Sequence, residues 1–165
     1  MSIAEDLLEQ AEHLASRERK RPKQASLRRA VSAAYYALFH LLVDEAASTL
    51  VTDRNLRLLV ARAFEHGHMK HAASSFASAA LPQNLAAIAG RKIPKDLQEV
   101  AATFIDLQEA RHEADYNFAE RFTRTEVQRH IHRARRAFAA WTRVKGQKIA
   151  RVFLAALLLA RRWDR

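Results

Sequence analysis

The sequence predicts an all-α protein: an antiparallel up-and-down bundle of four to five main helices with a C-terminal helical tail. Glycine and proline occur only three times each among 165 residues, and alanine and leucine are abundant. From 30 to 43 only Ser32 and His40 interrupt an apolar run. A helix that is apolar on every side must be surrounded by other helices, and this run is shorter than the roughly 20 residues of a membrane span.

The first helix is predicted to begin at Ser2, with Glu5 completing a capping box. Pro22 marks the predicted start of the core helix, because a helix tolerates proline in its first turn. Successive residues of a helix point about 100° apart, so Tyr35 and Tyr36 should pack against different neighbours. The apolar stripe of the first helix is Ile3, Leu7, Leu8, Ala11 and Leu14.

The middle of the chain is less regular. Asp53 should cap a third helix, whose apolar residues recur at helical spacing over 56–64. Gly67 is a candidate end or kink, and a short apolar face follows over 69–76. Over 81–94 the pattern lapses and two prolines and a glycine intervene, which indicates mostly loop.

Helical periodicity resumes over 95–118, and Thr123 with Glu126 forms a second capping box that opens a long helix. We expect a bundle over 1–145 and an apolar, basic helical extension over 146–165. The apolar block of this extension is too short to cross a membrane, so we expect it to pack on the bundle or on a second subunit.

The net charge of +10 is concentrated in two stretches, 17–29 and 124–151. Clustered positive charge favours a polyanionic partner, because binding to phosphates releases counterions. The alternative is a solvated surface that keeps the protein soluble. The residues expected to bind nucleic acid are Arg28, Arg29, Arg129 and Arg133. On the last long helix a basic ridge is predicted from Arg129, Arg133, Arg136 and Arg143.

Several classes of site are disfavoured. The chain has no cysteine, which excludes disulfides and fits a reducing compartment. Its acidic, amphipathic start is not a signal sequence, so we expect a cytoplasmic protein without membrane contact. His66, His68 and His71 lie close together, but Glu65 is the one further ligand nearby, so no metal is expected. Scattered glycines cannot form a phosphate-binding loop, and no cofactor is expected.

Arg111 is the residue that most needs explanation, because it lies on the apolar side of its predicted helix, in line with Phe118. A buried guanidinium requires a partner. Asp115, one turn later, is the nearest candidate, and Asp44 and Glu45 are the distant ones.

The segment RHEADY places four chemically useful groups within two helical turns. They are the guanidinium of Arg111, the imidazole of His112, the carboxylate of Asp115 and the phenol of Tyr116, and we predict them as the catalytic group. The alternative is structural, with Arg111 and Asp115 as a buried ion pair and Tyr116 as a core aromatic.

The stretch LRRAVSAAYYALFHLL, followed by RHEADY, resembles the HEPN superfamily of small helical-bundle proteins, and RAFEHGHMKHAASSF is similar to a middle helix of one branch. The resemblance implies a homodimer with paired arginine motifs in a shared cleft. Many members are metal-independent ribonucleases, often toxins of toxin–antitoxin pairs, that use an arginine, a following polar residue and a histidine farther along. Arg111 and His112 match the first two, whereas the eligible positions for the histidine hold Tyr116, Asn117 and Phe118.

This departure matters because histidine titrates near neutrality, whereas tyrosine, with a pKa of about 10, is a poor base at pH 7. The resemblance therefore leaves two functions open. One is an RNA- or nucleotide-binding protein, a degenerate metal-independent endoribonuclease. The other is a non-catalytic module that partners a minimal nucleotidyltransferase. A helical scaffold is the third interpretation.

Overall fold

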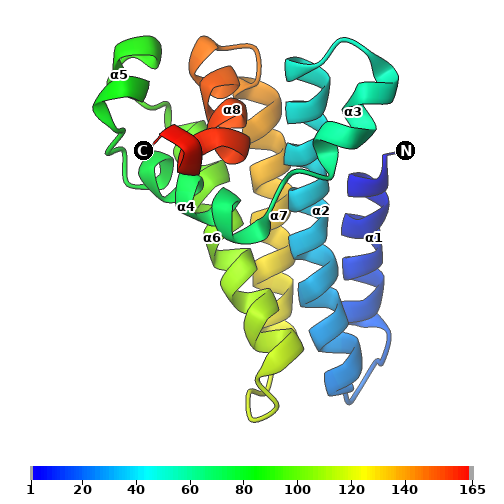
Figure 1. Cartoon of the computed structure of the whole chain (residues 1–165). Helices are drawn as coiled ribbons and strands as arrows, with labels where there is room; N and C mark the ends of the chain where they lie inside the picture. Colours follow the sequence, from blue (N-terminus) through cyan, green and yellow to red (C-terminus); the bar gives the residue numbers. More distant parts are fainter. Residues whose placement is uncertain (1, 164–165) are drawn as a thin grey trace.

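The computed structural model describes the backbone of residues 2–163 and the side chains of residues 2–160. Over these residues the chain is all-α, without a strand, which confirms the predicted fold class (Figure 1). The helices are α1 (Ile3–Ser16), α2 (Gln24–Leu50), α3 (Arg54–Ala61), α4 (His66–Ala77), α5 (Gln83–Ala89), α6 (Lys95–Tyr116), α7 (Arg124–Val144) and α8 (Lys148–Trp163).

Four long helices, α1, α2, α6 and α7, lie side by side and alternate in direction (Figure 1). The helix α2 packs against the other three, and α7 also contacts α1 and α6. The shorter α4 packs on α6, while α8 packs on α4 and α2. The up-and-down bundle predicted from the sequence is therefore the observed architecture, with α4 and α8 covering one part of it.

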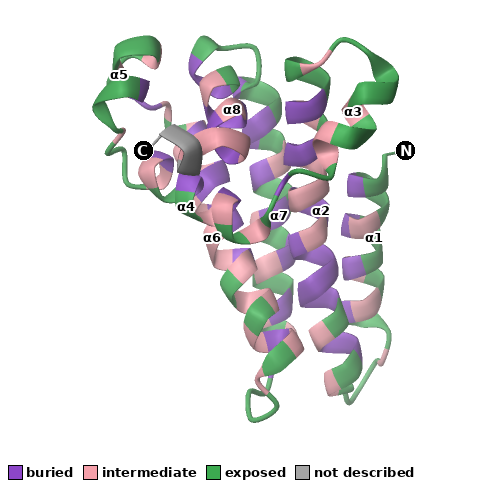
Figure 2. Cartoon of the chain, in the orientation of Figure 1, coloured by how far each residue is buried: buried purple, intermediate pink, exposed green. Residues whose placement is uncertain are grey.

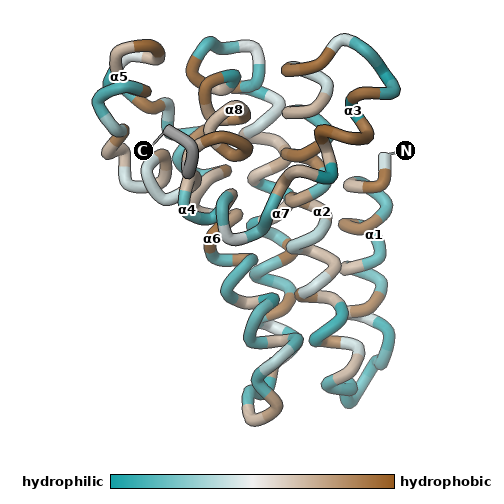
Figure 3. Tube along the Cα trace, viewed as in Figure 1, coloured by the Kyte–Doolittle hydropathy of each residue, from teal (hydrophilic) through white to brown (hydrophobic). Residues whose placement is uncertain are grey.

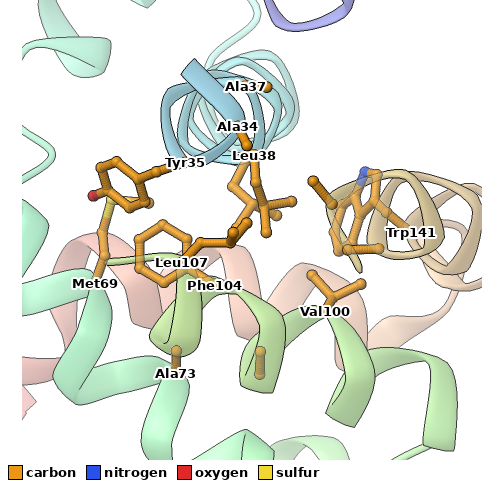
Figure 4. Close-up of a cluster of buried hydrophobic side chains, with 14 of the residues drawn as sticks. Ala34, Tyr35, Ala37, Leu38, Met69, Ala73, Val100, Phe104, Leu107 and Trp141 are labelled. Atoms are coloured by element: carbon orange, nitrogen blue, oxygen red, sulfur yellow. The ribbon is translucent and has the colours of Figure 1, made fainter. Parts of the chain in front are cut away.

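The core is built around α2, as its apolar run predicts. Every residue over 30–38 except Tyr36 is buried, and the buried residues concentrate along this helix (Figure 2). Figure 4 shows Tyr35 of α2 beside Phe104 of α6, with Trp141 of α7 across the same cluster. Burying each large apolar side chain contributes about 1.5–3 kcal/mol, so this cluster is the main source of stability.

Both predicted capping boxes are present. The Ser2 hydroxyl accepts from the Glu5 amide at 3.3 Å, and the Ser2 amide donates to the Glu5 carboxylate at 2.8 Å. Thr123 and Glu126 repeat the arrangement at 3.2 and 2.8 Å. Asp53 accepts from two backbone amides of α3, which confirms it as an N-cap. These side chains satisfy N–H groups that a helix start leaves without partners.

Two predicted boundaries are wrong by a few residues. The helix α2 begins at Gln24 rather than at Pro22, because Lys23 takes the N-cap conformation and its amide donates to the Glu18 carboxylate. The helix α6 ends at Tyr116, and Phe118 is 91% exposed instead of following the apolar face. The chain turns away at the end of α6, so a helical wheel does not apply there.

The middle segment also departs from its prediction. The predicted apolar side of α3 is only partly covered: Leu56 and Leu59 are 51% and 61% exposed, whereas Val60 packs against the core. The helix α3 packs mainly on α2. Gly67 does not end a helix but lies in the first turn of α4. The segment over 81–94 contains the helix α5, which ends at Ala89 and is capped by Gly90 with a φ of 84°.

The C-terminal helix α8 packs on the bundle. Phe153 contacts the ring of Phe76 in α4, with 4.9 Å between centroids, and both side chains are fully buried. Within the described residues, no helix is both long and apolar enough to cross a membrane.

Candidate functional site

Arg111 lies where α6 crosses the aromatic side of α2. Its Nη2 donates to the Tyr36 hydroxyl at 2.9 Å, and its Cζ lies 5.4 Å from the Tyr36 ring centroid and 5.8 Å from that of Tyr35. The Tyr116 ring lies 5.7 Å from the same carbon. Attraction between a cation and aromatic faces strengthens when water is excluded, so these rings form a favourable environment for the charge.

Asp115 is the ionic partner of Arg111, as the i, i+4 spacing predicts. Its Oδ2 lies 2.8 Å from Arg111 Nε, but the N–H does not point along this line, so the contact is an ion pair and not a hydrogen bond. The other carboxylate oxygen accepts from the Ser32 hydroxyl at 2.6 Å. The distant candidates are not used: Glu45 pairs with Lys145, and Asp44 is exposed.

The arginine is a permanent cation that still reaches solvent. Burial alone would lower the pKa of Arg111, but the nearby Tyr36 and Asp115 outweigh it and raise this pKa above its ordinary value. Its side chain keeps 17% of its exposure, and that of Asp115 keeps 26%. A guanidinium has five N–H donors, so the contacts to Tyr36 and Asp115 leave donors for an anion.

The histidine absent from the RHEADY segment has a spatial counterpart in His66. Its Nδ1 lies 2.5 Å from the Tyr35 hydroxyl, and its ring stacks at 4.4 Å between centroids on Phe39. The His66 carbonyl accepts from Gln108 of α6 at 3.0 Å, which ties the start of α4 to the helix that carries Arg111.

The environment of His66 favours its neutral form. Its pKa is lowered mainly by burial, and further by the positive charge of Arg111 and by His40. The Tyr35 phenol is buried and its pKa is raised, so it keeps its proton. A neutral imidazole has one ring nitrogen free to accept a proton, although burial and Arg111, which lower the pKa of His66, also make it a weaker base. Sequence spacing could not reveal His66, because a separate helix carries it to this site.

The two other predicted catalytic residues lie at the surface. The rings of His112 and Tyr116 are in contact, 5.1 Å apart between centroids and tilted by 49°, and Tyr116 is 60% exposed. The structure thus brings all four predicted residues together, with Arg111 and Asp115 inside and His112 and Tyr116 outside. A shallow depression of about 190 Å³ adjoins Arg111 and His112; its other lining residues are Lys70, Gln108, Glu109 and Glu113.

The predicted basic ridge on α7 is largely neutralised. Arg143 makes two hydrogen bonds to Asp96 at 2.8 and 3.0 Å, and Arg136 pairs with Glu99 at 2.8 Å. Arg133 pairs with Asp106. The acids follow α6 in the opposite order to the arginines on α7, as antiparallel helices require. Three ridge positions therefore tie helices together, while Arg129 is exposed.

The two arginines predicted at the start of α2 differ in their surroundings. Arg28 donates to the backbone carbonyls of Ala114 at 2.7 Å and Asn117 at 3.0 Å, and also to that of Glu120. These carbonyls belong to the C-terminal end of α6 and its following turn, where backbone acceptors lack helical partners. Arg29 is exposed. The guanidinium of Arg28 is thus engaged by the protein itself.

In the part of the chain that the structure describes, no three histidine, aspartate or glutamate residues gather to hold a metal ion. Comparison with known protein families, with curated proteins and with solved structures finds no match for this chain. The relation to the HEPN superfamily stays a prediction from sequence.

Proposed function

We propose that this chain is a HEPN-like, RNA-binding protein of the cytoplasm that acts as a homodimer and a metal-independent endoribonuclease of toxin–antitoxin type. Arg111 binds the scissile phosphate in a cleft shared by two copies. The observation that supports this most is the position of Arg111. Its guanidinium is mostly buried but still reaches solvent, it is held by Tyr36 and Asp115, and it lies close enough to His66 to lower the pKa of that imidazole.

In this mechanism the 2′-hydroxyl attacks the adjacent phosphorus. The bond between the 2′-oxygen and phosphorus forms, and the bond to the 5′-oxygen breaks. His66 takes the proton of the 2′-hydroxyl at Nε2 while its Nδ1–H donates to Tyr35, and the leaving 5′-oxygen takes a proton from water or from His112. Arg111 stabilises the added negative charge on the phosphate. The products are a 2′,3′-cyclic phosphate and a 5′-hydroxyl.

Tyr116 and Asp115 have supporting roles in this proposal. Tyr116 can donate from its hydroxyl to a phosphate oxygen, which does not require it to act as a base. Asp115 orients Arg111 through the ion pair at 2.8 Å and is itself oriented by Ser32.

The test is cleavage of labelled single-stranded RNA by the full chain in excess EDTA. Arg111→Met should reduce the rate at least about 100-fold, since one donor to a developing oxyanion supplies that much. His66→Asn should reduce it about 100- to 10,000-fold, the range of general-base catalysis. Arg62→Met, which changes an exposed arginine elsewhere, should leave it unchanged.

Each variant should keep the helical circular dichroism of the parent. Wild-type rates in Arg111→Met would overturn the proposal, and products ending in a 5′-phosphate would overturn the mechanism. Sedimentation of the full chain tests the homodimer, which should be present at the concentrations at which RNA is cleaved.

A second candidate function is a non-catalytic module that binds a minimal nucleotidyltransferase. The observation favouring it is that three leucines of the short helix α3, Leu56, Leu58 and Leu59, are exposed. Several large exposed apolar residues close together on a surface are typical of a protein interface. The described side chains of α8 offer less of such a surface, because Phe153 and Leu157 are buried against the bundle.

Co-purification with a nucleotidyltransferase encoded beside this protein tests the alternative. The double change Leu58→Lys and Leu59→Lys should abolish capture, whereas Ile88→Lys, at a comparably exposed position on α5, should not. Equal capture by both variants would exclude α3 as the interface.

A further inference from the structure

The turn from α1 to α2 and the turn from α6 to α7 lie at the same end of the bundle (Figure 1). This end carries a dense set of exposed cations. The turn between α1 and α2 is hydrophilic along its length (Figure 3). We call this surface the basic end. Its exposed cations are Arg17, Arg19, Lys20, Arg21, Lys23, Arg29 and Arg121.

The two turns of the basic end are fastened to each other and to the helices. Arg124 of α7 donates to the carbonyls of Ala15 at 3.2 Å and Arg19 at 3.1 Å. Gln24 at the start of α2 exchanges two hydrogen bonds with the backbone of Phe122, at 2.8 and 3.0 Å. Arg124 also places a positive charge where the C-terminus of α1 would otherwise repel an anion.

Two aromatic side chains project from the same end. Phe118 is 91% exposed and Tyr116 60% exposed, which is unusual for residues of their size. The turn that carries Phe118 is not a frayed end, because Arg28 holds the carbonyls of Asn117 and Glu120 on either side of it. The phenyl ring is therefore presented to solvent by an anchored backbone.

We propose that the basic end is a binding surface for single-stranded nucleic acid, with phosphates on its cations and a base stacked on Phe118. Surfaces that bind single strands combine these two elements, a positively charged track and aromatic platforms for bases. Tyr116 connects the surface to the candidate site, since its ring lies 5.7 Å from the Arg111 guanidinium. The inference rests on the proposed function for the identity of its ligand, RNA.

The arrangement favours a single strand over two other polyanions. A duplex keeps its base faces stacked inside, so Phe118 would have nothing to stack on. A membrane surface requires a broad apolar face opposite the charges, whereas the basic end offers Phe118 and Tyr116 among many cations.

The binding test uses a fluorescent 2′-O-methyl RNA 12-mer, which cannot be cleaved through its 2′-oxygen, and the full chain. Phe118→Ala should weaken binding about 5- to 150-fold, the value of one stacked base. Ile88→Ala, a truncation at an exposed position on α5, should not weaken it. Inorganic polyphosphate, which has charge but no bases, should bind Phe118→Ala as tightly as the parent.

A separate experiment, the dependence of the affinity on salt concentration, measures the contribution of charge. The double change Arg19→Ala and Arg21→Ala should reduce the slope of log K against log salt by about 1.4, since each single-strand phosphate contact contributes about 0.7. The matched double change Arg54→Ala and Arg62→Ala removes two exposed arginines at the start and at the C-cap of α3, and it should not alter the slope.

Failure of this surface and failure of the nuclease proposal are distinguishable. If Arg111→Met stops cleavage, and Phe118→Ala weakens binding of the 12-mer equally in the parent protein and in Arg111→Met, both proposals hold. Loss of binding in Phe118→Ala without any cleavage by the parent supports the surface alone. Any of three results would overturn the inference. Phe118→Ala could bind the 12-mer as tightly as the parent, or the parent could bind duplex RNA as tightly as the single strand. The third result is that binding to phosphatidylserine vesicles requires Phe118 whereas binding to the 12-mer does not.

Discussion

Arg111 of α6 donates to the hydroxyl of Tyr36 of α2 at 2.9 Å while its guanidinium carbon lies 5.4 Å from the centre of the same ring. Tyr36 thus contacts the cation in two ways, through a hydrogen bond to its hydroxyl and through a cation–π contact with its ring. This contact joins the apolar core helix to the RHEADY segment, the two stretches on which the resemblance depends.

The hydroxyl and the ring of Tyr36 can be separated by mutation. Tyr36→Phe should lower the free energy of unfolding by about 0.5–1.5 kcal/mol, because it removes one hydrogen bond and keeps the ring. Urea denaturation measures the change. Tyr116→Phe is the matched control at a mostly exposed tyrosine and should have almost no effect. Equal effects of the two changes would show that the Tyr36 hydroxyl does not stabilise Arg111.

Adjacent arginines at the start of α2 should behave differently. Arg28→Ala should destabilise the fold by at least about 2 kcal/mol, because hydrogen bonds from a charged group are worth about 1.5–3 kcal/mol each and the carbonyls of Ala114 and Asn117 lose their donor. Arg29→Ala changes an exposed side chain of the same type and should be close to neutral. Thermal and urea unfolding of both variants measure this, and a neutral Arg28→Ala would contradict the assigned role.

The ion pairs between α6 and α7 should contribute little individually and depend on salt. Arg136→Ala removes the partner of Glu99 and should cost about 0.2–1 kcal/mol at low ionic strength. In about 1 M NaCl the Debye length is about 3 Å, so most of this difference should disappear. Urea denaturation at both salt concentrations measures it. A cost that persists in high salt would indicate lost packing of the side chain instead.

The His66 imidazole should make stability depend on pH. Because its pKa is lowered in the folded state by burial, Arg111 and His40, the unfolded chain binds more protons between the folded pKa and about 6.5. The contribution is complete above pH of about 6.5 and is lost as pH falls below it. His66→Asn should therefore show a smaller loss of stability between pH 7.5 and 5.5 than the parent.

The control for this measurement is His13→Asn, at an exposed position on α1, which should keep the parental pH dependence. Burial and the nearby Arg133 also lower the pKa of His130, so a residual slope should remain in His66→Asn. If His66→Asn and the parent lose stability equally on acidification, His66 is not the titrating group.

Local signals in the sequence determined much of this protein. The capping residues Ser2, Asp53 and Thr123 begin their helices as predicted, because a cap acts through backbone groups within a few residues. The buried α2 and the ion pair of Arg111 with Asp115 also follow from spacing along one helix. Periodicity predicts such features because they depend on one element at a time.

Tertiary structure decided which surfaces are covered and which distant groups meet. Leu56 and Leu59 of α3 and the ring of Phe118 are exposed because no neighbouring helix covers them. The periodicity of a sequence does not contain the positions of neighbouring helices. The ridge arginine Arg143 binds Asp96 across antiparallel helices. His66 joins Arg111 because α4 folds onto α6 and α2, so the environment of the candidate site is a property of helix packing.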